Sequence, residues 1–256
     1  MKTTNSAELI EPKINAIACH MCGRCSGYRG AVALHTRSPN REILSPPAEA
    51  ASRWDALLLT FGLLGVATGA FQWSASPWFV QLKQGLAAWL IARDLYWPLG
   101  DGAPWWLLTH YPETNDLFTW LDGALILFYI GTTAALIGGA FLLALRLAGW
   151  LLRRRALPWR LVHGVTPLAG ISVFLGLSAL TVSLLQAERL ALAWVPGLRA
   201  GLLAIGLLWS GWLLWRLLAT APDNGITPAR RALAWTVLMS PAGLVAWSWV
   251  AMFYYW

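Results

Sequence analysis

Charge is scarce in this sequence. Only 12% of its 256 residues are charged, whereas soluble domains carry roughly 25%. Hydrophobic residues make up 57%, and Trp alone occurs 18 times. So few charges could not cover so much apolar surface in water, which excludes a cytosolic enzyme, a disordered protein and a free nucleic-acid binder. The sequence predicts an integral membrane protein, in which lipid solvates the apolar side chains.

Cysteine is also scarce, and several common motifs are missing. The three cysteines, Cys19, Cys22 and Cys25, are close together, and no cysteine elsewhere can pair with them. A disulfide framework is therefore excluded. The chain has no Walker loop, no Rossmann glycine pattern and no nucleophile elbow. These absences remove the common signatures of nucleotide-binding enzymes and of hydrolases with a nucleophile elbow.

Long apolar runs predict the fold class. Each of five stretches is long enough to cross roughly 30 Å of hydrocarbon. They lie near 54–73, 117–149, 161–186, 197–219 and 232–254. We expect an all-α integral membrane protein with about five transmembrane helices. Its membrane domain covers 54–256 and follows a cytoplasmic segment, 1–53, that carries a short ferredoxin-like cysteine loop.

Basic residues predict the orientation of these helices. Segment 1–53 holds seven Lys or Arg residues, and two further basic clusters follow the second and fourth stretches, at 153–160 and 230–231. Basic loops remain on the cytoplasmic side of a membrane. With five spans, every cluster falls on one side, so we expect a cytoplasmic N-terminus and a C-terminus outside.

The segment 74–116 does not fit a sixth span. Residues 77–92 are apolar but include Gln81, Lys83 and Gln84. If this stretch crossed the membrane, the basic loop at 153–160 would move outside. We therefore expect an interfacial or re-entrant helix on the outer face.

Two features near this outer segment carry candidate chemistry. His110 and Glu113, with Asp116 close by, offer nitrogen and oxygen ligands for iron or copper. A polar interfacial loop is the alternative, because no ligand spacing here is diagnostic. Asp122 lies near the start of the second span, where we favour a helix cap or a side chain that snorkels to the interface over a functional acid.

The run CHMCGRC, residues 19–25, is the most specific signal in the chain. Its spacing, C-x2-C-x2-C, is typical of a loop that binds an iron–sulfur cluster, with each thiolate on a different iron. The sequence therefore predicts a cluster bound by Cys19, Cys22 and Cys25.

The fourth ligand of a 4Fe-4S cluster is not in this run. The bacterial pattern continues C-x3-C-P, and this chain has no fourth cysteine. His35, an external thiolate and a cysteine of a partner chain are the candidates. A 3Fe-4S cluster would need only the three thiolates. Zinc held by three cysteines and a histidine is a further alternative, as is a reduced site without metal.

A family resemblance accompanies the motif. The strings CHMCGRCSGYRGAVAL, RSPNREI, FQWSASPWFVQLKQ and PWWLLTHYPETNDLFTWLDGALI resemble the C-terminal half of membrane-bound bacterial 4Fe-4S polyferredoxins of the NapH and NosR type. One branch of that family is associated with ferrous-iron transport systems that contain an iron permease. Full-length members carry an N-terminal membrane half with C-x3-C-P motifs, which this chain lacks.

The resemblance implies a protein of the bacterial inner membrane that transfers electrons to a membrane or periplasmic partner in iron uptake. The implied partners are a redox protein, the missing N-terminal half and an iron permease system, with no nucleic acid. The competing hypothesis is a structural membrane subunit whose cysteine run binds zinc or docks a partner.

Overall fold

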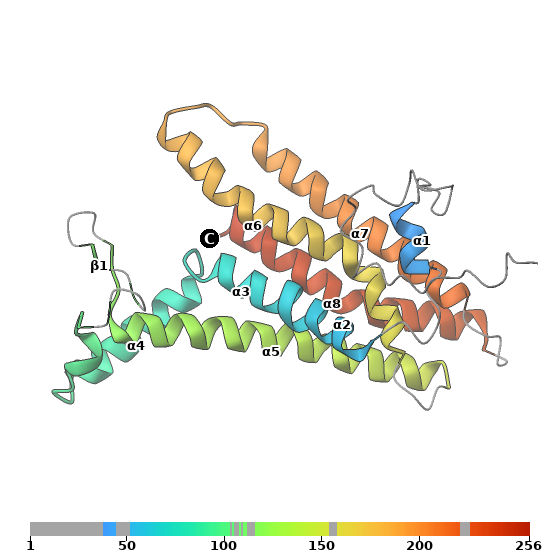
Figure 1. The fold of residues 1–256 in the computed structure, drawn as a ribbon, viewed down its shortest axis with the longest axis horizontal. Coiled ribbons are helices and arrows are strands. Elements are labelled where there is room, and N and C mark those ends of the chain that lie inside the picture. The colour runs from blue at the N-terminus through green and yellow to red at the C-terminus, as the bar shows by residue number, and fades with distance from the viewer. Residues whose placement is uncertain are drawn as a thin grey trace, which may run out of the picture. The chain divides into compact units, whose positions relative to one another are not determined.

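The structure, a computed structural model, describes residues 38–44, 52–102, 104, 108, 110–111, 116–153, 158–220 and 226–256. The chain divides into two compact units, 1–39 and 40–256, and almost all described residues belong to the second. Five helical spans of this second unit are long and apolar enough to cross a membrane (Figure 1). The predicted class, an all-α membrane protein, is confirmed. The spans are Arg53–Gln72, Trp120–Leu151, Trp159–Ala187, Val195–Ala219 and Pro228–Tyr254.

The first span joins three helical segments: α2 (Arg53–Leu57), the π-helix η3 (Leu58–Val66) and α3 (Ala67–Gln72). Ser52 caps its start, because the Ser52 hydroxyl accepts a hydrogen bond from the amide of Trp54 at 3.1 Å. The Thr60 hydroxyl donates to the carbonyl of Ala56 at 2.9 Å inside the π-helix. Such back-bonding competes with the regular helical ladder, and π segments of this length are rare.

Glycines let the first span approach the second span, α5 (Trp120–Leu151). A Cβ added at Gly65 would lie 2.7 Å from the Cα of Ala134, and one added at Gly69 would lie 3.0 Å from the Cα of Ile130. Gly65 and Gly69 therefore form a small-x3-small contact, which is how membrane helices gain close backbone packing.

The other spans complete the bundle. The 3-10 segment η6 (Trp159–Val165) leads into α6 (Thr166–Ala187), and α7 (Val195–Ala219) and α8 (Pro228–Tyr254) follow. α5 packs on both η3 and α8, and α7 packs on both α6 and α8. The core contains the fully buried Leu64, Phe141, Leu168, Leu214 and Trp249.

Smaller elements attach to this bundle. α4 (Pro77–Ile91) forms inside the segment expected to be interfacial and packs against the start of α5 through Phe79, Leu90, Leu121 and Leu125. A 3-10 turn, η4 (Trp97–Leu99), follows, and then β1 (His110–Tyr111) pairs antiparallel with β2 (Asp116–Leu117). A short helix, α1 (Pro39–Leu44), precedes the first span. The interfacial position of α4 stays a prediction.

α5 is longer than a membrane span requires. Its 32 residues would reach about 48 Å at about 1.5 Å per residue, against roughly 30 Å of hydrocarbon. Its first turns carry the contacts with α4. The extra length of α5 therefore provides the surface on which α4 packs.

Candidate functional site

The cysteine site predicted from the sequence lies outside the described residues. Cys19, Cys22, Cys25 and the candidate fourth ligand His35 all fall in the part of the chain before Ser38. Among the residues that the structure describes, no group of three or more His, Cys, Asp or Glu side chains is placed to hold a metal ion. The iron–sulfur site and its zinc alternative both stay predictions.

The outer nitrogen-and-oxygen site is also untested. The backbone of His110 lies in β1, where it is paired with Leu117, and Tyr111 is paired with Asp116. Glu113 lies outside the described residues. The hypothesis of an iron or copper site at His110 and Glu113 therefore stays a prediction.

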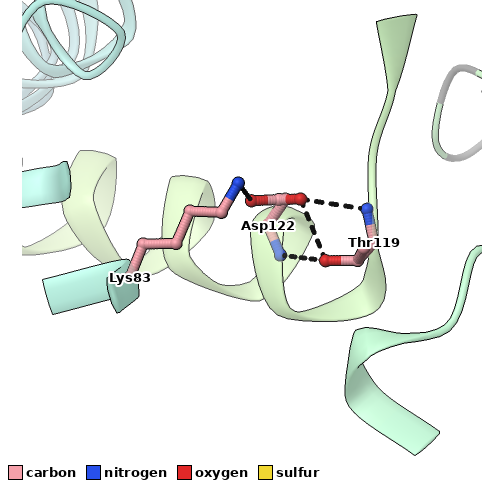
Figure 2. Close-up of polar contacts among 3 residues, drawn as sticks. All are labelled: Lys83, Thr119 and Asp122. Carbon is pink, nitrogen blue, oxygen red and sulfur yellow. Dashed lines mark hydrogen bonds and ion pairs between the residues drawn. The ribbon is translucent and has the colours of Figure 1, made fainter. Parts of the chain in front are cut away.

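Asp122 is the acidic side chain whose surroundings the structure defines best (Figure 2). Its carboxylate is only 5% exposed, and one oxygen, Oδ1, lies 2.5 Å from the Nζ of Lys83 on α4. The other oxygen, Oδ2, accepts the Thr119 amide at 3.1 Å and the Thr119 hydroxyl at 2.9 Å. The same hydroxyl accepts the Asp122 amide at 3.2 Å.

These contacts make Asp122 a helix cap. Thr119 and Asp122 form a capping box at the start of α5, in which each side chain satisfies the other residue's backbone amide. Of the two structural roles favoured from the sequence, a cap or a snorkelling side chain, the cap is present. The sequence did not predict Lys83 as the partner, because Lys83 comes from a different helix. With three donors on its carboxylate, Asp122 fixes structure and offers no free acid for proton transfer.

Arginines gather at one end of the bundle. At this end α2, η6 and α8 begin, and α5 and α7 end (Figure 1). The arginines within or next to these termini are Arg53, Arg153, Arg160, Arg216, Arg230 and Arg231. The opposite end is mixed in charge: α6 ends beside Glu188 and Arg189, α4 ends beside Arg93 and Asp94, and Arg199 lies near the start of α7. Most arginines of the described residues therefore lie at one end of the bundle.

The segment Asn40–Leu44 of α1 is held on the bundle by two side-chain contacts. The guanidinium of Arg160 donates to the carbonyl of Leu44. The indole of Trp209, on α7, donates to the Asn40 amide oxygen at 2.8 Å. Ile43 and Leu44 also pack against the core. α1 therefore lies against η6 and α7.

Neutral polar groups lie inside the bundle. The Gln72 amide donates to the Ser248 hydroxyl at 3.2 Å, which ties the end of α3 to α8. The Ser210 hydroxyl accepts from the Leu168 amide at 3.2 Å. The buried Thr68 and Ser172 hydroxyls have no hydrogen-bond partner among the described residues. Hydroxyl and amide groups orient helices, but they are poor ligands for a transition metal.

The bundle defines the class of protein: an all-α membrane protein that crosses the bilayer several times. Its best-defined polar site is the contact of Lys83 with Asp122. No protein-family model, curated protein or solved structure matches the chain.

Proposed function

We propose that this chain is a membrane-bound iron–sulfur electron-transfer protein, which passes electrons to a membrane or periplasmic partner. The spacing of Cys19, Cys22 and Cys25 carries the proposal. Three thiolates separated by two residues each are a donor set that fits the irons of a cluster. These cysteines would hold the cluster, and His35 is the candidate fourth ligand within the chain. When bound, such a cluster takes up and releases single electrons.

The proposed orientation has the N-terminus in the cytoplasm of a bacterium and the C-terminus in the periplasm. The arginines at one end of the bundle support it, since basic residues remain on the cytoplasmic side. The attachment of Asn40 and Leu44 agrees with it, because Arg160, which holds the Leu44 carbonyl, belongs to that arginine-rich end.

The proposed partners follow from the width of the membrane. The described residues offer no second group of metal ligands, and roughly 30 Å of hydrocarbon is too wide for useful direct tunnelling. Other subunits would therefore complete the route. By the resemblance, these are a redox protein or the N-terminal polyferredoxin half, in an iron-uptake system with an iron permease.

Substitution of the cysteines tests the proposal. The full chain is purified anaerobically, and its iron, zinc, acid-labile sulfide and visible absorbance are measured. We expect iron and sulfide in the wild-type chain, and their loss or conversion to a smaller cluster in Cys22→Ser. Met21→Leu, in the same loop but without a ligand, is the matched control and should keep the wild-type content. His35→Ala tests the fourth ligand.

Two results would contradict iron–sulfur binding by the cysteines. Unchanged iron and spectrum in Cys22→Ser would refute the ligation. One zinc per chain with neither iron nor sulfide would favour the structural subunit. A membrane extract that retains the chain in every variant shows that the fold survives, so that loss of metal reports on the site alone.

A further inference from the structure

A groove lies between α7 and α8, in the half of the bundle next to the arginine-rich end. Its volume is about 720 Å³, within the range of roughly 300–1,000 Å³ for small-molecule sites. α7 contributes Gly211, Trp212 and Trp215, and α8 contributes Trp235, Met239 and Gly243, among others. Both helices are membrane spans, so the groove opens toward the hydrocarbon.

Fixed aromatic side chains form the walls of this groove. The indole of Trp235 donates to the carbonyl of Gly211 at 2.8 Å, which ties α8 to α7. Trp215 meets Trp235 edge to face, with ring centroids 6.5 Å apart. The hydroxyl of Thr236 donates to the carbonyl of Leu233 at 2.8 Å. The polar groups of Trp235 and Thr236 are therefore occupied within the protein, and these walls offer apolar contact.

Glycine keeps the groove open. A Cβ added at Gly243 would meet no atom within 4 Å, so Gly243 borders open space along the groove. At Gly211 a Cβ would lie 3.2 Å from the ring of Trp235. A larger residue at Gly243 would therefore fill the groove, whereas one at Gly211 would press on its wall.

Arginines lie near the groove, at the ends of its two helices. Arg216 is exposed in the last turn of α7, and its guanidinium lies 5.7 Å from the ring centroid of Trp212, which lines the groove. Arg230 lies in the first turn of α8 at the same end and adds positive charge there. A ligand that matches both the arginines and the apolar groove has an anionic head and a long apolar tail.

We propose that this groove binds an anionic phospholipid. Arg216 holds the phosphate, and an acyl chain lies along Trp212, Trp235 and Gly243. Basic residues at the ends of membrane helices recognise anionic headgroups in this way. A helix from a second copy or another protein is the competing occupant. The lipid is favoured because an apolar helix would leave the charge of Arg216 without a counterion.

Native mass spectrometry of the full chain tests this proposal. The protein is equilibrated in mild detergent with equimolar phosphatidylglycerol and phosphatidylcholine, and the lipids retained per chain are counted. We expect retention of one phosphatidylglycerol in preference to phosphatidylcholine. Arg216→Gln should lower that retention about fivefold, the effect of one cation near the surface. Gly243→Leu should abolish it, since the new side chain fills the groove.

Two matched control variants distinguish loss of the lipid site from a general effect of losing an arginine or adding a side chain. Arg146→Gln removes an exposed arginine of α5. Gly170→Leu adds a side chain to α6 at a position where a Cβ meets nothing within 4 Å. Both should retain lipid as the wild type does. Equal retention of the two lipids, or equal retention in all four variants, would overturn the proposal. A dimer that Gly243→Leu dissociates would show that a helix occupies the groove instead.

Discussion

Lys83 on α4 and Asp122 on α5 form an ion pair across two helices, with Nζ 2.5 Å from Oδ1 (Figure 2). The lysine is about half exposed and the carboxylate is almost fully buried. The capping box with Thr119 orients the carboxylate by contacts within the first turn of α5, separate from the contact with the lysine. The pair therefore connects α4 to the bundle at the capped start of α5.

Removing the lysine should loosen α4. We expect Lys83→Met to weaken the docking of α4 by about 1 kcal/mol, a value for a partly exposed pair. Hydrogen exchange of the amides in α4 should then rise about fivefold, because 1.4 kcal/mol corresponds to roughly a factor of ten. Asp122→Ala should also lose the cap, which costs about a further 1 kcal/mol.

Arg93→Gln is the control for this prediction. The Arg93 guanidinium lies 3.9 Å from the ring centroid of Trp89 in the preceding helix, so its loss removes a cation without removing a contact between α4 and α5. Exchange in α4 that is the same for Lys83→Met and the wild type would show that the apolar contacts alone hold the helix.

We expect substitution to Ala to have different effects at two glycines of the π-helix η3. A Cβ at Gly65 would lie 2.7 Å from the Cα of Ala134, whereas one at Gly62 would meet nothing within 4 Å. Because backbone cannot yield as a side chain can, Gly65→Ala should destabilise the bundle by about 1–3 kcal/mol. Gly62→Ala should be neutral or slightly stabilising. The unfolding midpoint in mixed micelles, followed by circular dichroism, measures both; equal midpoints would contradict the packing of η3 on α5.

Reporter fusions test the proposed orientation. An alkaline phosphatase fused after Trp256 should be active, because that enzyme folds only outside the cytoplasm. A green fluorescent protein inserted in the loop 221–225, between α7 and α8, should fluoresce, because that loop joins the arginine-rich ends. An inactive phosphatase after Trp256, together with a non-fluorescent green fluorescent protein between α7 and α8, would contradict this orientation.

The helices were predictable from sequence because a membrane span must satisfy its own backbone and present apolar side chains throughout. Hydropathy alone therefore located five spans, and the structure places their ends within a few residues of the expected ones, as at Trp120 and Ala219. Asp122 near the start of the second span also indicated a cap, and its partner Thr119 lies within one helical turn of it, so this contact is local in sequence.

Contacts between helices were not predictable in the same way. Nothing in the spacing of the sequence couples Lys83 to Asp122, or Gln72 to Ser248. The groove depends on how α7 and α8 cross, and its glycines look like ordinary membrane glycines in sequence. For the cysteine motif the opposite holds. Its spacing alone predicts its chemistry, but its residues lie outside the part that the structure describes.

The central claim, a redox-active cluster on Cys19, Cys22 and Cys25, is tested most directly by EPR of the anaerobically purified chain before and after dithionite. We predict a signal that appears on reduction, with about four irons and four sulfides per chain, as for a cubane cluster. A signal present before reduction and lost after it, with about three irons, would show that the three cysteines act alone. No signal in either state, and neither iron nor sulfide in fresh protein, would contradict the claim.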